Sequence, residues 1–153
     1  MKKILFLLLI ISCSCVFAQV SRTKLICNRE GLMVYLKIEE ISNVGNDSIF
    51  IIRGSNKRYK YINDDITISR GSAQDVYDFL VSLKLFAEKY ENDYDVVEKK
   101  GDLRFSRVYA AIGKGGVSIS NDRGYTNIRY KAILKLIDEF VEYTSKNNIQ
   151  LKL

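Results

Sequence analysis

The segment 75–90 constrains the fold more than any other part of the chain, because its apolar side chains recur at three- and four-residue steps. On a helix this spacing places them on one face, which carries Val76, Phe79, Leu80, Leu83, Phe86, Ala87 and Tyr90. Ser72 can accept a hydrogen bond from the first-turn amides, and Asp75 places negative charge at the positive end of the helix dipole. The sequence therefore predicts an amphipathic helix that needs an apolar surface to pack against.

Short β-type segments on both sides of this helix can supply that surface. The clearest is 32–39, where apolar and polar side chains alternate as they do in a half-buried strand. Further strands are expected at 23–27, 49–52, 58–62, 66–69, 103–112 and 117–120, and a last edge strand at 149–153. The turn residues between them predict that 49–52 pairs with 58–62 and that 103–112 pairs with 117–120.

A second amphipathic helix is expected at about 130–145, burying Ile133, Leu134, Ile137, Phe140 and Val141. The segments 66–90 and 117–144 resemble each other, with Phe79 placed opposite Ile133 at a spacing of 54 residues. This favours a weak internal repeat, although any strand, turn and amphipathic helix would align about as well. The predicted fold is α+β: a single antiparallel sheet of two hairpin or meander units, with both helices packed on one face.

The first eighteen residues are typical of a bacterial export signal and not of a folded element. Lys2 and Lys3 form a basic start, an unbroken apolar run follows at 4–11, and Val16 to Ala18 forms a small-residue cleavage site. The apolar run is too short to span a bilayer. The expected organisation is a signal peptide at 1–18 and one α+β domain at 19–153, periplasmic or secreted, with no transmembrane segment.

A lipoprotein anchor is the alternative interpretation of the same region. Ile10 to Cys13 resembles a lipobox, whose cysteine is lipidated, but Ile11 stands where a small residue is usual.

Cleavage after Ala18 would remove Cys13 and Cys15 and leave Cys27 as a lone thiol. Its neighbours Leu25 and Ile26 predict a strand, so Cys27 is expected to be a buried small apolar residue.

Composition excludes several function classes. The chain has no histidine, so it cannot build a Ser-His-Asp or Cys-His catalytic apparatus or a histidine-dependent zinc site. Its formal net charge is +6, which falls to +4 when Lys2 and Lys3 leave with the signal, and this mild excess is not typical of a specific nucleic-acid-binding protein. No cofactor is expected, and catalysis is the less favoured interpretation. The oligomeric state is left open.

The segment 53–61 is the best candidate for a binding site. It combines four cations with two aromatic residues: Arg53, Lys57, Arg58, Tyr59, Lys60 and Tyr61. Strand alternation would place Arg58 and Lys60 on one face, where they could dock phosphates, sulfates or carboxylates. The alternative is an edge strand whose lysines prevent sheet-to-sheet aggregation.

Two acidic patterns are weaker candidates. Glu91, Asp93, Asp95 and Asp102 have part of the spacing of a calcium loop, but Val96 replaces the required glycine and a solvated loop is the simpler interpretation. Asp64 and Asp65, with Asp47 and Asp122 in other loops, could serve a carboxylate-dependent hydrolase if two of them faced each other across a cleft. Turn formation explains aspartate at all of these positions.

These observations predict a small exported binding or interaction domain without catalytic activity. Its contact surface is expected near segment 53–61, for an anionic polymer or surface. Two alternatives stay open: an inhibitor or envelope adaptor that binds a protein partner, and a carboxylate-dependent hydrolase.

Overall fold

The computed structural model describes residues 22–31, 34–42, 48–58, 64–109 and 114–153. Within them the chain forms two four-stranded antiparallel sheets, each a meander in chain order and each followed by a helix. The first sheet contains β1 (Arg22–Gly31), β2 (Val34–Ser42), β3 (Ser48–Ser55) and β4 (Asp65–Gly71), and α2 (Ala73–Lys89) follows it. The second sheet contains β5 (Val97–Lys100), β6 (Leu103–Val108), β7 (Gly116–Asn121) and β8 (Gly124–Arg129), and α3 (Tyr130–Lys146) follows it.

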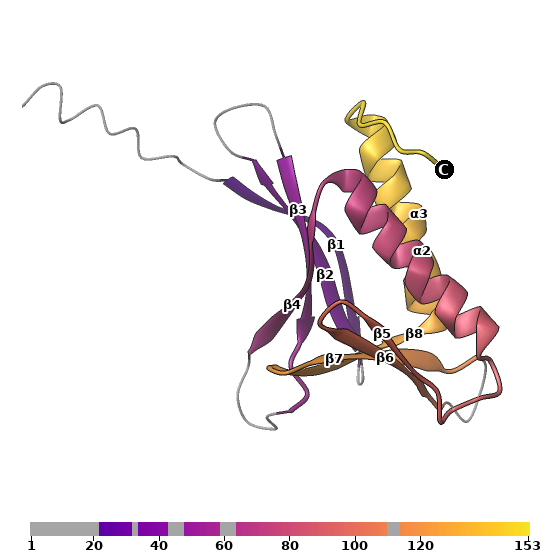
Figure 1. The fold of residues 1–153 in the computed structure, drawn as a ribbon. Coiled ribbons are helices and arrows are strands. Elements are labelled where there is room, and N and C mark those ends of the chain that lie inside the picture. Colours follow the sequence, from indigo (N-terminus) through magenta and orange to yellow (C-terminus); the bar gives the residue numbers. More distant parts are fainter. Residues whose placement is uncertain (1–21, 32–33, 43–47, 59–63, 110–113) are drawn as a thin grey trace, which may run out of the picture.

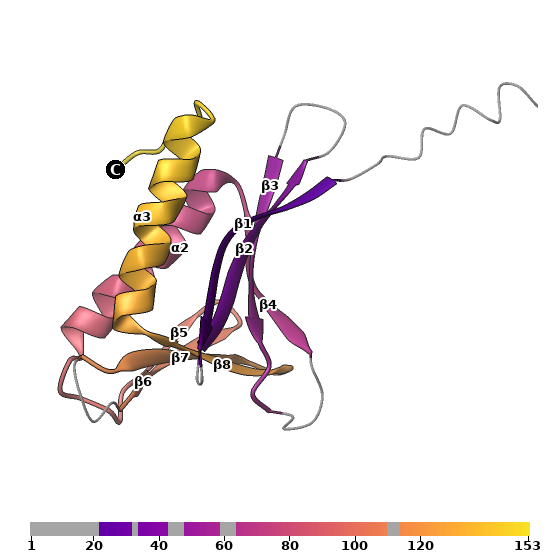
Figure 2. The same ribbon diagram turned by 180° about the vertical axis from the view of Figure 1, so that it is seen from behind.

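The two helices lie side by side against the same side of the first sheet, and the second sheet crosses below them (Figure 1). Helix α2 contacts β3 and β4, whereas α3 contacts β1. Strand β8 at the edge of the second sheet contacts β2, β3 and β4, as the view from behind also shows (Figure 2). The two sheets therefore meet through β8, and the second sheet turns its outer face away from the helices.

One buried apolar cluster joins all these layers. It includes Leu36, Ile38 and Phe50 from the first sheet, Phe105, Val117, Ile119 and Ile128 from the second, and residues of both helices. Phe50 packs edge-on against Phe140 at a ring-centroid distance of 5.5 Å. Phe105 packs in the same manner against Phe79 and Phe86, at 5.9 Å from each. Aromatic contacts thus tie each sheet to a helix.

The predicted start of the first long helix is confirmed. The Asp75 amide donates to the Ser72 hydroxyl at 3.2 Å, and the Asp75 carboxylate accepts from the Ser72 amide at 2.8 Å, so the two residues form a capping box. The hydrogen bond from the Ser72 hydroxyl, followed by the one from its amide, holds the pKa of Asp75 below its ordinary value. The predicted burial of Cys27 is also confirmed.

The prediction of a single sheet is wrong, because β5, β6, β7 and β8 form a second sheet that is separate from the first. Helix α2 stands between β4 and β5, and its 17 residues carry the chain about 25 Å. After α2, β5 pairs with β6 and not with β4. Both missed strands are polar: β5 has the sequence VEKK, and only three residues of β8 are buried.

The predicted hairpin between 49–52 and 58–62 is also wrong. Strand β3 runs on to Ser55, and its partner is β4, with Ile52 opposite Ser69 and Gly54 opposite Ile66. Residues 59–62 lie outside the described residues. The expected edge strand at 149–153 is not a strand either: Ile149 and Leu151 pack against the core, and the Lys152 amide donates to the Gln74 side chain at 2.8 Å.

The predicted correspondence between the two helices at a spacing of 54 residues is wrong, although the chain does contain two units of antiparallel strands followed by a helix. The buried positions of α3 are Ile133, Leu136, Phe140 and Thr144. Leu134, Ile137 and Val141, which were expected to be buried, are half-buried. Ile133 lies in the first turn of α3, whereas Phe79 lies in the second turn of α2, so the spacing of 54 residues pairs positions that are not equivalent.

Candidate binding surface

Arg53, the first cation of the segment 53–61, lies in a network of charges on the outer face of the first sheet. Its Nε atom lies 3.1 Å from Glu39, as an ion pair without hydrogen-bond geometry. Lys37 bridges Glu39 and Asp65 at 3.3 and 2.8 Å. The hydrogen bond to Asp65 raises the pKa of Lys37 well above its ordinary value, against the effect of burial. Arg53 is therefore engaged within the sheet and does not extend a basic strip.

Arg58 lies at the junction between the two sheets. Its guanidinium donates to the Asp122 carbonyl in the turn between β7 and β8 at 3.0 Å. The Lys57 amide donates to the Tyr125 carbonyl of β8 at 2.8 Å, while its side chain is half-buried. The chain beyond β3 therefore runs beside the edge of the second sheet. Tyr59, Lys60 and Tyr61 lie outside the described residues.

Asn56 holds this junction together. It is 3% exposed, and its side-chain amide donates to the Arg123 carbonyl at 3.3 Å and to Asp64 at 3.4 Å. Its side-chain oxygen accepts from the Arg58 amide at 3.0 Å. A Cβ atom on Gly124 would lie 2.0 Å from that oxygen, so only glycine permits this approach. Asn56 thus fixes Arg58 against the second sheet.

The outer face of the second sheet carries a row of residues that the registers place opposite one another: Lys99, Arg104, Ser120 and Tyr125. Lys99, Arg104 and Tyr125 are exposed, one each on β5, β6 and β8. Neighbouring strands lie about 4.8 Å apart, so the four residues cross the whole sheet. Arg104 contacts the Asp122 carboxylate at 3.8 Å, and Asp122 also accepts from Arg58 through its carbonyl. Arg58 therefore continues the row at the β8 edge.

We call Lys99, Arg104, Tyr125, Arg58 and Arg123 the basic row. It comprises four cations, from β5, β6, the segment after β3 and the turn after β7. The Asp122 carboxylate contacts the row at Arg104, and the long 3.8 Å separation makes a weak surface ion pair. The arrangement can bind several negative charges along a line that crosses the sheet from β5 to β8. Tyr125 adds an aromatic side chain to this line.

Only Arg58 of this row was singled out from the sequence. Arg104 could have been placed on the outer face by the alternation of Leu103 and Phe105 with polar neighbours. Lys99 could not, because β5 was not recognised as a strand. The proximity of Asp122 and Arg123 to Arg58 and Asn56 depends on the junction between the sheets, which the sequence does not indicate.

The acidic candidates are spread over separate contacts. Glu91 lies 3.3 Å from Lys114, and Asp93 accepts from the Asp95 amide at 3.2 Å. Asp102 lies in the turn beyond β5, at the opposite end of that strand from the residues 91–95. The described residues contain no group of three or more side chains able to hold a metal ion.

The aspartates of the hydrolase hypothesis also have neighbours. Asp65 pairs with Lys37 on the outer face of the first sheet, whereas Asp64 accepts from Asn56 at the junction. Asp122 contacts Arg104, and Asp47 lies outside the described residues. The described aspartates thus point to three different partners.

Comparison with protein-family models, with curated proteins and with solved structures finds no match. The candidate surface therefore rests on geometry and charge alone. In the part of the chain that the structure describes, no helix has the length and apolarity required to cross a membrane.

Proposed function

We propose that this protein is an exported, non-catalytic binding domain whose basic row holds an anionic polymer such as a sulfated polysaccharide. The observation that carries the proposal is the convergence of Lys99 and Arg104 with Arg58 along one line of the second sheet. Cations arranged in a row suit a ligand with repeated negative charges, because each charge meets one cation without bending the polymer. A row that crosses a whole sheet suits a long ligand better than a small one.

The thermal stability of the protein with and without heparin, at low and at high salt, tests the proposal. Ligand that binds only the folded state raises the melting temperature by mass action, and salt screens contacts between exposed charges. We expect heparin to raise the melting temperature at low salt and to lose this effect at high salt. No shift at either salt concentration would contradict the proposal.

Charge-reversal variants locate the site. The double variant Lys99→Glu with Arg104→Glu should remove the heparin effect. The matched control is Lys131→Glu with Lys135→Glu, which changes two exposed lysines of α3 and leaves the same net charge. If both double variants weaken heparin binding equally, the interaction depends on overall charge and not on the basic row.

Removing the Asp122 carboxylate gives a gain-of-function test. Asp122→Asn leaves the Arg58 contact intact, because Arg58 binds the backbone carbonyl of Asp122. The Asp122 carboxylate and the polymer are both negative, so its removal should tighten polyanion binding by a few-fold at low salt, about 0.5–1 kcal/mol. Unchanged or weaker binding would place the polymer away from Arg104.

A further inference from the structure

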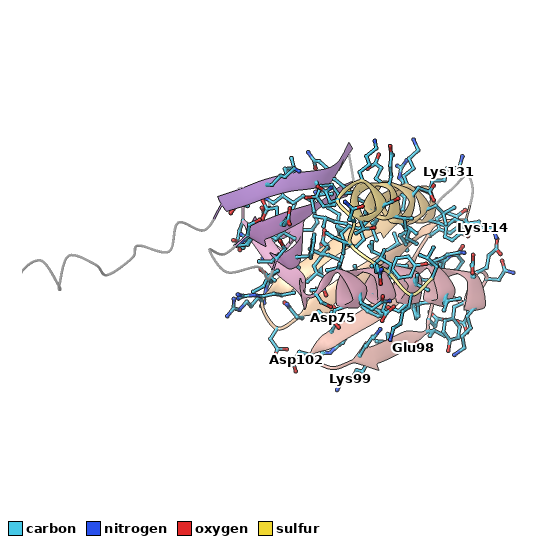
Figure 3. The ribbon with its side chains drawn as sticks, turned by 90° about the horizontal axis from the view of Figure 1, so that it is seen from above. Asp75, Glu98, Lys99, Asp102, Lys114 and Lys131 are labelled. Carbon is cyan, nitrogen blue, oxygen red and sulfur yellow. The ribbon has the colours of Figure 1, made fainter. Side chains whose placement is uncertain are left out.

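A groove runs between α2 and the edge strand β5, and Lys99 of the basic row lies at its rim. Its volume is about 370 Å³, near the lower limit for small-molecule sites in general. Helix α2 lines it with Ser82, Leu85, Phe86 and Lys89, a spacing that forms one stripe on a helix. Figure 3 shows Glu98, Lys99 and Asp102 following one another alongside α2.

The groove has an apolar floor that opens to solvent. Phe86 and Phe105 form the base, and both rings are buried. Leu85 stands above them at 57% exposure, although it belongs to the same stripe. An exposed leucine over two buried aromatic rings is a favourable contact for an apolar partner.

The backbone of β5 offers hydrogen bonds at the same place. Two residues, Gly101 and Asp102, connect β5 to β6, so the closing pair Lys100–Leu103 is hydrogen-bonded and the pairs alternate along the strand. The amide and carbonyl groups of Val97 and Lys99 consequently point away from β6. No hydrogen bond from them occurs among the described residues, in which β5 is the edge strand of its sheet.

The charges at the rim favour an acidic partner. Glu98 accepts from the Tyr90 hydroxyl at 2.5 Å and from Lys89 at 3.0 Å, and these bonds lower its pKa. Lys99 and Lys100 are exposed and have no ion-pair partner in the described part of the chain. Edge lysines can also serve to prevent strand pairing. That role does not account for the exposure of Leu85 over the groove.

We propose that an extended segment of another polypeptide, with alternating aliphatic and acidic side chains, adds to β5 as a further strand. Its backbone bonds to Val97 and Lys99, as in other cases of β-strand addition. Its aliphatic side chains point toward α2 and enter the groove over Phe86 and Phe105. Its acidic side chains point to the opposite face, beside Lys99. This docking site goes beyond the polyanion-binding function and makes the protein an adaptor between a polymer and a polypeptide.

A blocked hexapeptide that alternates aspartate and leucine is a suitable probe. We expect it to bind the protein and to slow hydrogen exchange of the Val97 and Lys99 amides. The same peptide with lysine in place of aspartate should bind at least about tenfold more weakly. A peptide N-methylated on the amides of one edge should also lose binding when that edge faces β5, because methylation removes the donors.

One variant of the groove and one of the β5 edge complete the test. Leu85→Gln keeps a helix-forming residue and removes the apolar contact, and we expect it to weaken peptide binding about tenfold. Val97→Pro removes an outward amide without breaking the β5–β6 ladder, which edge strands tolerate, and should also weaken binding. Circular dichroism and the melting temperature verify that both variants are folded.

Arg58→Gln separates this site from the basic row. It should leave peptide binding within about twofold of the wild-type value, because Arg58 lies beyond β8, at the opposite edge of the sheet from β5. Three outcomes would overturn the proposal: equal binding by the wild type and Leu85→Gln, unchanged exchange of the Val97 and Lys99 amides in the presence of saturating peptide, or loss of binding in Arg58→Gln.

Discussion

Asn56 is the residue on which the junction between the sheets depends most. Its buried side chain bonds to Arg123, to Asp64 and to the Arg58 amide. Replacement by alanine leaves these groups without their partner, so we expect Asn56→Ala to lower the free energy of unfolding by about 1–3 kcal/mol. Urea titration measures the change.

The exposed Asn92 supplies the control for this prediction. Asn92→Ala makes the same chemical change outside the junction and should cost less than about 0.5 kcal/mol. If the two variants were equally stable, Asn56 would not hold the sheets together, and the position of Arg58 beside Asp122 would lose its main support.

Tyr143 provides a pH-dependent test of the contact between α3 and the first sheet. Its hydroxyl donates to the buried Glu40 carboxylate of β2, and burial together with this bond raises the pKa of Tyr143 to about 12. A raised folded-state pKa stabilises the protein fully below the unfolded value of about 10. That stabilisation is lost as the pH rises toward 12.

Tyr143→Phe should therefore be less stable than the wild type at neutral pH, by about 1–3 kcal/mol, because Glu40 loses its donor. The difference between the two proteins should shrink as the pH rises from about 10 to about 12. Urea midpoints across this range measure it, with Tyr125→Phe, at an exposed position, as the control. A difference that stays constant would show that the Tyr143 hydroxyl is not bonded to Glu40.

At the scale of single elements, α2 separates stability from binding along one helix. Leu83 is fully buried and Leu85 is 57% exposed, two residues away. Leu83→Ala should lower the free energy of unfolding by about 2–5 kcal/mol, because it leaves a cavity in the core. Leu85→Ala should change it by less than about 0.5 kcal/mol. Chemical denaturation measures both values, and a loss below about 0.5 kcal/mol for Leu83→Ala would contradict the burial of this face.

The elements differ in how far the sequence predicts them, for physical reasons. Helix α2 is predictable because its apolar residues form a single stripe and Ser72 with Asp75 marks its start. The buried face of α3 cannot be predicted in the same way. Its first two turns carry four apolar residues that fit more than one stripe: Ile133, Leu134, Leu136 and Ile137. Strand β5 has no apolar alternation, since it is an exposed edge whose pairing with β6 supplies its stability.

The candidate site, too, is only partly predictable from the sequence. Arg58 stands out in the sequence because it lies among other cations, but its neighbours in space come from β8 and the turn after β7. Arg104 becomes its neighbour only through the contacts of both residues with Asp122. Such contacts depend on strand register and on the packing of two sheets, which a single sequence does not specify.

On the scale of the whole molecule, the shared core predicts cooperative unfolding. Apolar residues of both sheets and both helices form one buried cluster, so neither unit buries its own helix alone. We expect a single thermal transition in which the calorimetric and van't Hoff enthalpies agree. Differential scanning calorimetry tests this expectation, and two resolved transitions would contradict the single core.

The central claim is that the basic row on the outer face of the second sheet binds a polyanion, and amide NMR on titration with a short heparin oligosaccharide tests it most directly. We predict that the largest shifts occur at Lys99, Arg104, Ser120 and Tyr125 and at Arg58, and that the amides of α3 stay unperturbed. Shifts concentrated on α3, or spread evenly over all exposed lysines, would contradict the claim.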